Sequence, residues 1–306
     1  MKRSFNKILL SVPAFLVCSS LLYPIQALSQ QNYVDNSGMN GWSIGAGIDY
    51  KQFSNNGTNF ASTLHDDFNI DTDYHTGFNA WIGYRIPVKN SDIRLDYSHI
   101  KTTDSSDVSA NNLFLWGNAV DSASGKIKYD FSSVDLTAGH TTSLSPTFDL
   151  HYYGGLNYTS LTKDMNLSGH SPTDSYGFDV GTDYHGWGPV FGMDGTCHPA
   201  PSSIPGFGVL GGVKTGFPYG TLSNHFDSFE NNTSSSDHIP DEKIVVPTVG
   251  AKLAVKYDFP MNSSKWGMEL GYESTTFFGA TKNSNYNGTS INTNLQGFYF
   301  NLGGSF

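Results

Sequence analysis

The amino-acid sequence predicts an all-β protein, a transmembrane antiparallel β-barrel of about ten strands, with about eight to twelve compatible with the pattern. The composition favours strands and turns, because 33 of the 306 residues are glycine, 14% are aromatic and only 14% are charged. Apolar and polar residues alternate in many short runs. Long and short links alternate between these runs, as they do in outer-membrane barrels, which have long extracellular loops and short periplasmic turns.

The chain ends in an alternation that suits a membrane wall. Phe298, Phe300, Leu302 and the terminal Phe306 share one parity, opposite small and polar residues. A strand with one apolar and one polar face suits a wall between lipid and a polar interior. These residues alone would also fit a half-buried strand of a soluble sandwich, so the rest of the chain has to decide.

Ten such runs can be placed along the chain. We expect strands at about 42–50, 74–86, 93–99, 127–138, 148–158, 184–193, 205–217, 245–259, 266–272 and 298–306. The two glycine-rich runs, 184–193 and 205–217, have the least clear period. In the run 127–138 the apolar parity changes near Ser132, which predicts a β-bulge that restores the facing.

The links sort by length along the chain. Long polar links, expected to be extracellular loops, cover 52–73, 101–121, 160–182, 218–242 and 280–290. Most of the others are short enough for periplasmic turns, and only 194–204 is too long. A soluble sandwich has no reason to sort its connections this way, so the sorting favours the barrel.

Aromatic residues stand near both ends of the expected strands, as in interfacial girdles. One predicted rim contains Trp42, Tyr84, Phe148, Phe259, Trp266 and Phe306, and the other contains Tyr50, Tyr74, Tyr129, Tyr158 and Tyr272.

Residues 1–29 have the pattern of a secretory signal peptide, and the barrel is expected over residues 30–306. Lys2, Arg3 and Lys7 precede an apolar run and a small-residue cleavage site after Ser29. Cleavage after Ala27 and a retained anchor remain alternatives. Loss of this segment changes the formal charge from −10 to −13, so nucleic acid is excluded as a partner.

The parity opposite the apolar one predicts which charged side chains point into the barrel. The candidate lumen lining is Arg85, Arg94, Asp96, Asp135, Lys252, Lys256 and Glu269. Buried charges are paired or hydrated, so these residues either form a salt-bridged core or line a water-filled pore. A barrel of ten strands is intermediate in size between small barrels, whose interior is filled by side chains, and large barrels, which contain a channel.

Catalytic, cofactor and metal sites are not expected. Ser223 near His225, and Ser98 beside His99, lack a third partner, so an outer-membrane hydrolase is the least favoured of three classes. The favoured function is a porin that lets small hydrophilic solutes or ions diffuse passively. The alternative is a non-conducting barrel that serves as a surface adhesin or structural protein.

Several segments also carry a family resemblance: KIKYDFSSVDLTAGH (126–140), IVVPTVGAKLAVKY (244–257), GMELGYES (267–274) and LQGFYFNLGG (295–304). Together with the N-terminal segment they resemble the Legionella major outer membrane protein family of pore-forming barrels. The resemblance implies the outer membrane, porin activity and, in some members, surface adhesion. It does not identify a solute.

The expected surroundings give the predicted partners. They are outer-membrane lipid and lipopolysaccharide, the barrel-assembly machinery through the strand ending at Phe306, a further copy of the chain, and a ligand on a host surface. Cys197, the one cysteine of the mature chain, is expected on the periplasmic side. Family members cross-linked by disulfides imply an inter-subunit bridge there, and an inert thiol is the alternative.

Overall fold

The computed structural model describes residues 41–86, 90–199, 202–231, 233–261, 263–282 and 290–306, and it is all-β. Its strands are β1 (Trp42–Ser54), β2 (Asn59–Ser62), β3 (Asp67–Asn69), β4 (His75–Ile86), β5 (Ser91–Leu115), β6 (Asn118–Ser145), β7 (Phe148–His170), β8 (Ser175–Cys197), β9 (Phe207–Gly216), β10 (Tyr219–Glu230), β11 (Thr233–Val245), β12 (Thr248–Met261), β13 (Ser264–Lys282) and β14 (Ser290–Ser305). Within these ranges no helix is long and apolar enough to cross a membrane. The predicted signal peptide lies outside the described residues.

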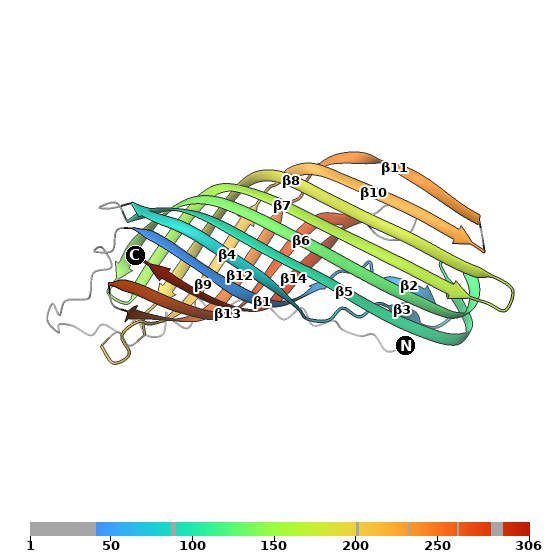
Figure 1. Cartoon of the computed structure of the whole chain (residues 1–306), viewed down its shortest axis with the longest axis horizontal. Helices are drawn as coiled ribbons and strands as arrows, with labels where there is room; N and C mark the ends of the chain where they lie inside the picture. The colour runs from blue at the N-terminus through green and yellow to red at the C-terminus, as the bar shows by residue number, and fades with distance from the viewer. Residues whose placement is uncertain (1–40, 87–89, 200–201, 232, 262, 283–289) are drawn as a thin grey trace.

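Ten strands close into an antiparallel ring in the order β8-β7-β6-β5-β4-β1-β14-β13-β12-β9, and β9 pairs back onto β8. The predicted barrel of about ten strands is therefore confirmed. The last strand, β14, pairs with β1 and β13, and its apolar residues Phe298, Phe300 and Leu302 are exposed on the outside. The start of β1 and the C-terminus lie at the same end of the ring (Figure 1).

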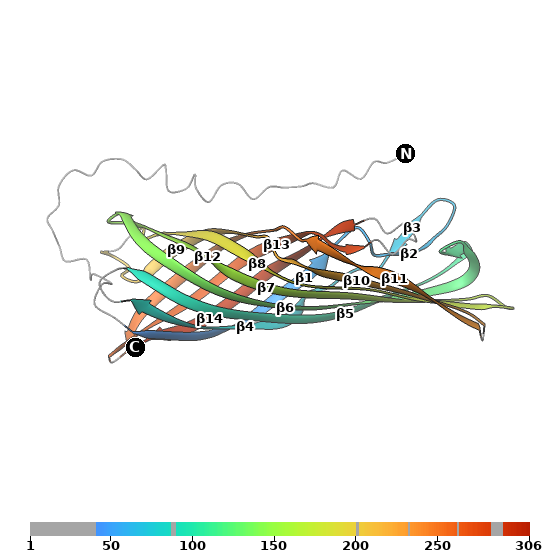
Figure 2. The ribbon, with the colours of Figure 1, turned by 90° about the horizontal axis from the view of Figure 1, so that it is seen from above.

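The opposite end of the barrel differs from the sequence prediction. Three of the long links predicted as polar loops are largely strand, because β5 to β8 run on as two long hairpins and β10 and β11 form a third. Trp116 and Gly117 have φ angles of 46° and 95°, which allow a tight turn between β5 and β6. We call the outer parts of β5 to β8, together with β10 and β11, the outer sheet; it extends well beyond the ring (Figures 1 and 2).

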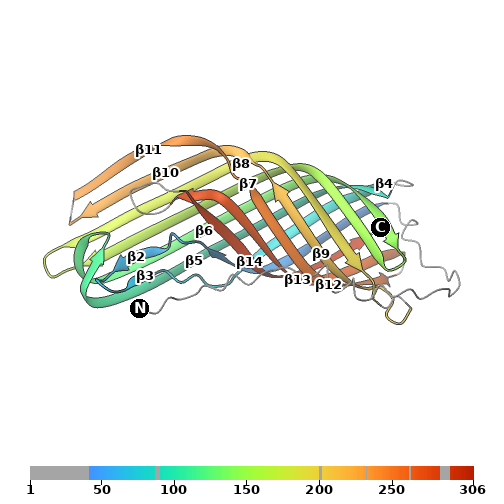
Figure 3. The same ribbon diagram turned by 180° about the vertical axis from the view of Figure 1, so that it is seen from behind.

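The hairpin β10–β11 leaves the ring at two prolines. Pro218 stands between β9 and β10, and Pro247 between β11 and β12. A proline has no N–H group for the ladder, so the regular pairing is interrupted there. Beyond these prolines β10 pairs with β8, whereas β11 pairs with β10 alone among the strands that the structure describes. Seen from behind, the hairpin separates from β13 and β14 (Figure 3).

The expected bulge near Ser132 is wrong, because β6 stays in one register with β5 through this region. Ile127, Tyr129 and Phe131 are buried on the inner face of the outer sheet. Tyr129 is 0% exposed and does not belong to the outer aromatic girdle. The parity change therefore marks the place along β6 where the interior of the barrel becomes apolar and its exterior becomes polar. Lys126, Lys128 and Asp130 share the parity that faces outward.

The long link between β1 and β4 folds inward. We call residues 55–74, which include β2 and β3, the inserted loop. Phe60 and Ile70 are 1% and 2% exposed and pack over Gly125, where an added Cβ would lie 2.9 Å from atoms of both side chains. Glycine at 125 thus allows the loop to approach the sheet closely.

Candidate functional site

A polar cavity of about 400 Å³ lies inside the ring. Its walls carry acidic side chains of Asp49, Asp92, Asp96, Asp135, Asp194, Glu269 and Glu273, and basic side chains of Lys51, Arg94, Lys214 and Lys252. These residues point inward because the opposite parity of each strand carries the exposed apolar side chains.

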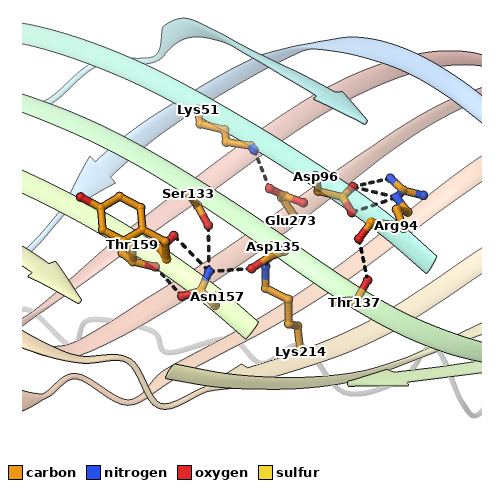
Figure 4. A network of polar contacts seen from close by, with 11 residues as sticks. Lys51, Arg94, Asp96, Ser133, Asp135, Thr137, Asn157, Thr159, Lys214 and Glu273 are labelled. Carbon is orange, nitrogen blue, oxygen red and sulfur yellow. Dashed lines mark hydrogen bonds and ion pairs between the residues drawn. The ribbon is translucent and has the colours of Figure 1, made fainter. Parts of the chain in front are cut away.

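Most of the basic groups are paired with carboxylates on strands that are not their direct neighbours, as Lys51 and Lys214 show in Figure 4. The Nζ of Lys214 on β9 lies 2.6 Å from Asp135 Oδ2 on β6, which is three strands away in the ring. Lys252 Nζ lies 3.1 Å from Asp194 Oδ2, and Lys51 Nζ lies 2.5 Å from Glu273 Oε1. The charged groups therefore join strands that are two or three positions apart in the ring.

Arg94 has a second kind of partner near the cavity. It binds Asp96, with 2.6 Å between Nη2 and Oδ1, and its guanidinium lies 4.9 Å from the ring centroid of Trp81. Trp81 projects into the barrel, and an added Cβ at Gly45 would lie 2.0 Å from its ring. The two glycines facing Trp81, Gly45 and Gly303, leave the space that this large side chain occupies.

The structure places five of the seven predicted lining residues at the cavity: Arg94, Asp96, Asp135, Lys252 and Glu269. The other two are not among its lining residues. Arg85 lies opposite Asp92 near the end of β4, and Lys256 Nζ is 3.6 Å from Asp258 Oδ2 near the end of β12.

Other lining residues escaped the prediction. Lys51 follows the last residue assigned to the first strand, and Asp194 falls in the predicted link 194–204, which β8 partly covers. Lys214 belongs to the glycine-rich run 205–217, whose period is unclear. The exposed Val209 and Val213 on β9 would have indicated that Lys214 faces inward. Asn157 is a further missed residue: it donates to Asp135 Oδ1 at 2.6 Å and so orients the partner of Lys214.

Apolar side chains fill the barrel between the cavity and the outer sheet. This apolar layer consists of Phe53, Ile100, Tyr129, Phe131, Leu161, Tyr184, Leu222, Val246, Phe277 and Leu295, each at most 7% exposed. Phe131 on β6 and Phe277 on β13 belong to opposite strands of the ring, and their ring centroids are 5.3 Å apart. Side chains from opposite walls therefore meet in the lumen.

Polar contacts hold the inserted loop over this layer. Lys163 Nζ donates to the Gly57 carbonyl at 2.7 Å, and Asn55 Nδ2 donates to Tyr129 Oη at 2.7 Å. At the other end of the loop, Asp73 N donates to Asp104 Oδ1 on β5 at 3.2 Å. Both ends of the loop are thus bound to the outer sheet.

Lys163 lies beyond the expected outer aromatic rim at Tyr158, and it is 3% exposed. Burial in the apolar surroundings lowers the pKa of its amine to about 8, because the charged form loses its hydration.

The remaining candidate residues lie apart. Cys197 ends β8, half-buried, opposite Phe148 on β7 and Val209 on β9. Ser98 lines the cavity, whereas His99 Nδ1 lies 3.0 Å from Ser132 Oγ. His225 is exposed on β10, with its Nε2 3.7 Å from Asp179 Oδ1. Among the described residues, no group of three potential metal ligands gathers.

Comparison with known proteins adds a family and a set of barrels. Residues 28–306 match the model of a family described as Legionella pneumophila major outer membrane protein precursor. No curated protein sequence matches the chain.

Among solved structures, the Escherichia coli outer membrane protease OmpT aligns with a TM-score of 0.46 and 10% identity, covering 87% of this chain and 96% of OmpT. Yersinia pestis Ail, an attachment invasion locus protein, aligns with a TM-score of 0.27 and 9% identity over 87% and 99% of the two chains. A Pseudomonas aeruginosa FadL homologue aligns with a TM-score of 0.27 and 7% identity, covering 88% of this chain and 90% of the homologue.

Proposed function

Because the chain belongs to the Legionella major outer membrane protein family, we propose that it is an outer-membrane barrel with a closed lumen that supports the outer sheet on the cell surface. Membership of this family places the protein in the bacterial outer membrane. The surface role rests on the outer sheet, which projects from the end of the ring opposite the start of β1 and the C-terminus.

The contact between Phe131 and Phe277 carries the proposal of a closed lumen. These rings come from opposite strands and lie 5.3 Å apart, so the wall residues themselves fill the width of the barrel. Phe53 and Tyr129 stack beside them with 4.5 Å between centroids. Apolar groups in van der Waals contact leave no hydrated path for ions.

Passive diffusion of small solutes or ions is the second candidate function, and the polar cavity supports it. A water-accessible space lined by carboxylates and ammonium groups is what a pore needs in its inner part. For this function the apolar layer and the inserted loop would have to move apart.

Conductance across planar bilayers separates the two functions. The refolded wild-type barrel should give no discrete current steps. A variant that combines Phe131→Ser, Phe277→Ser and replacement of residues 56–72 by a short Gly-Ser linker should give steps, because a hydrated path then reaches the cavity. The loop replacement alone is the control and should stay silent. Discrete steps from the wild-type protein would contradict the closed lumen and favour the pore.

The proposal extends to the surroundings of the barrel. The apolar outer face contacts lipid and lipopolysaccharide, and the strand ending at Phe306 is offered to the assembly machinery. Cys197 at the end of β8 is the proposed position of a bridge between copies, which non-reducing gels after thiol blocking would reject by showing only monomer. Catalysis is not part of the proposal, since Ser98 and His99 have opposite parity on β5.

A further inference from the structure

We propose that β11 is a docking edge that accepts a basic, extended polypeptide segment as an additional strand. The inference rests on the proposed function in one respect, that the outer sheet faces the cell's surroundings. It does not depend on whether the lumen conducts.

The first observation is that β11 is an edge strand. Among the described strands it pairs with β10 alone. Its described side chains from Thr233 to Lys243 are all exposed. Towards β13, the contact described is the ion pair between Glu242 and Lys282 at the base of the hairpin. Beyond this ion pair, the side of β11 that faces away from β10 therefore offers backbone N–H and C=O groups to another strand.

The second observation is that this edge is held in place before any partner arrives. The strand β10 pairs with β8 from Tyr219 to Glu230, which gives the hairpin a long rigid support. Trp116, Phe178 and Phe226 pack together where the hairpin joins the outer sheet, with Trp116 and Phe178 centroids 5.1 Å apart. A pre-organised strand loses little conformational entropy when it is extended by a further strand.

Asn231 fixes the turn of the same hairpin. Its φ of 52° lies in the left-handed region, which asparagine tolerates better than most residues. Its side chain accepts from Ser175 N at 3.0 Å and donates to Asp174 Oδ1 at 3.1 Å. These bonds join the tip of β10–β11 to the neighbouring turn.

The third observation is the charge of the hairpin. Residues 219–245 contain the acids Asp227, Glu230, Asp237, Asp241 and Glu242, and one basic residue apart from histidine, Lys243. An antiparallel pair made from two copies of β11 would bring like charges together, which is unfavourable. A partner strand rich in lysine or arginine would be attracted by the same negative charge, so the charge of the hairpin favours a basic segment.

The accessible stretch has defined limits. Ser234, Ser235 and Ser236 have small side chains that leave the backbone open. Pro240 has no N–H group, and the pairing of β10 with β11 shifts between Leu222 and Asn224. The regular edge is therefore Thr233–Ile239, a length that suits a short extended peptide.

The test uses a peptide of five Lys-Thr repeats with blocked termini, and the full mature chain refolded in zwitterionic micelles. Fluorescence anisotropy of the labelled peptide should show saturable binding that weakens with salt. An acidic Glu-Thr peptide should not bind. A Lys-Thr peptide N-methylated at alternate amides keeps its charge but cannot form the ladder, and it should bind at least tenfold more weakly.

Charge variants locate the site. Asp237→Asn with Asp241→Asn should raise the Kd roughly five- to tenfold, as expected for two exposed charge contacts. Asp66→Asn with Asp67→Asn removes the same charge from exposed positions of the inserted loop and should leave the Kd unchanged.

Three outcomes would overturn the inference. Equal binding of the N-methylated peptide would show attraction without strand pairing. Equal loss in both double variants would show a general charge effect. Concentration-dependent dimers in sedimentation, abolished by the Asp237 and Asp241 changes, would assign β11 to a second copy. Conductance by the wild-type barrel would contradict the closed lumen but leave the peptide result standing.

Discussion

The part of β6 within the membrane and the part beyond it have opposite arrangements of the same residue types. Near its end in the ring, Val134 and Leu136 point to lipid while Asp135 lines the cavity. In the outer sheet, Lys128 is on the outside while Ile127 and Tyr129 are buried. The alternation of side chains is uninterrupted, so the solvent on each side determines which parity is apolar.

This difference explains how each part of the barrel is held together. Within the membrane, the interior is joined by ion pairs such as Lys214 with Asp135. In the outer sheet, buried apolar side chains and the inserted loop form a core like that of a soluble protein. Substitutions should therefore change the stability of the barrel for different reasons within the membrane and in the outer sheet.

The largest effect should come from an interior charge within the ring. Lys51, with 6% of its side chain exposed, neutralises Asp49 at 3.0 Å and Glu273 at 2.5 Å. Lys51→Met leaves two enclosed carboxylates without their cation, so the free energy of unfolding should fall by about 3–5 kcal/mol. Urea unfolding in phosphatidylcholine vesicles, followed by tryptophan fluorescence, measures the change. Lys101→Met, at a side chain that is 63% exposed, is the control and should change it by less than about 1 kcal/mol.

The next effect should come from the apolar core of the outer sheet. Leu161 on β7 is 0% exposed, and Leu161→Ala should lower the free energy of unfolding by about 2–5 kcal/mol through the cavity it leaves. Its neighbour Thr162 has the opposite parity and donates to Asp183 Oδ1 at 3.2 Å. Thr162→Ala should cost about 1 kcal/mol or less. Similar costs at both positions would mean that the outer sheet has no core.

The smallest effect has the opposite sign. The pKa of Lys163 is about 8 in the folded chain and 10.5 ordinarily, so between these values the unfolded chain binds more protons and stability rises with pH. Lys163→Met removes the cost of burying the amine, roughly 3 kcal/mol near pH 7, and loses a hydrogen bond worth about 1 kcal/mol. The variant should therefore be about 2 kcal/mol more stable at pH 7.

The pH dependence checks the cause. Unfolding should be compared between pH 7 and pH 10.5, where the advantage of the Lys163→Met variant should disappear. An advantage that is the same at both pH values would reflect packing, and a loss of stability at pH 7 would contradict a costly buried amine.

The sequence predicted the ring because lipid demands apolar residues on one parity over a fixed length. Val249, Leu253 and Val255 on β12 and Phe298 and Phe300 on β14 could be placed from this rule alone. Arg94, Asp96, Asp135, Lys252 and Glu269 could be placed at the cavity by the opposite parity. The ion pairs of Asp135 with Lys214 and of Lys252 with Asp194 could not be predicted, because they join strands that are distant in the chain.

The outer sheet could not be predicted from the same rule. Leu113, Leu161 and Leu167 alternate within stretches dominated by Ser, Thr, Asn and Asp, where they suggested loops. The apolar parity there belongs to an internal core. Tyr129 was assigned to the aromatic girdle because a bulge near Ser132 was expected to keep its side of the strand facing lipid. Burial of Phe60 and Ile70 depends on a long-range contact with β6, for which the local sequence holds no signal.

Accessibility of spin labels on β6 tests the inversion of parity most directly. In a Cys197→Ser background, labels at Lys128→Cys, Tyr129→Cys and Leu136→Cys would be measured in lipid vesicles with a water-soluble nickel complex and with oxygen. The label at 128 should respond to the nickel complex, the label at 136 to oxygen dissolved in lipid, and the label at 129 weakly to both. Equal responses at 128 and 136, or a fully water-accessible label at 129, would contradict the account.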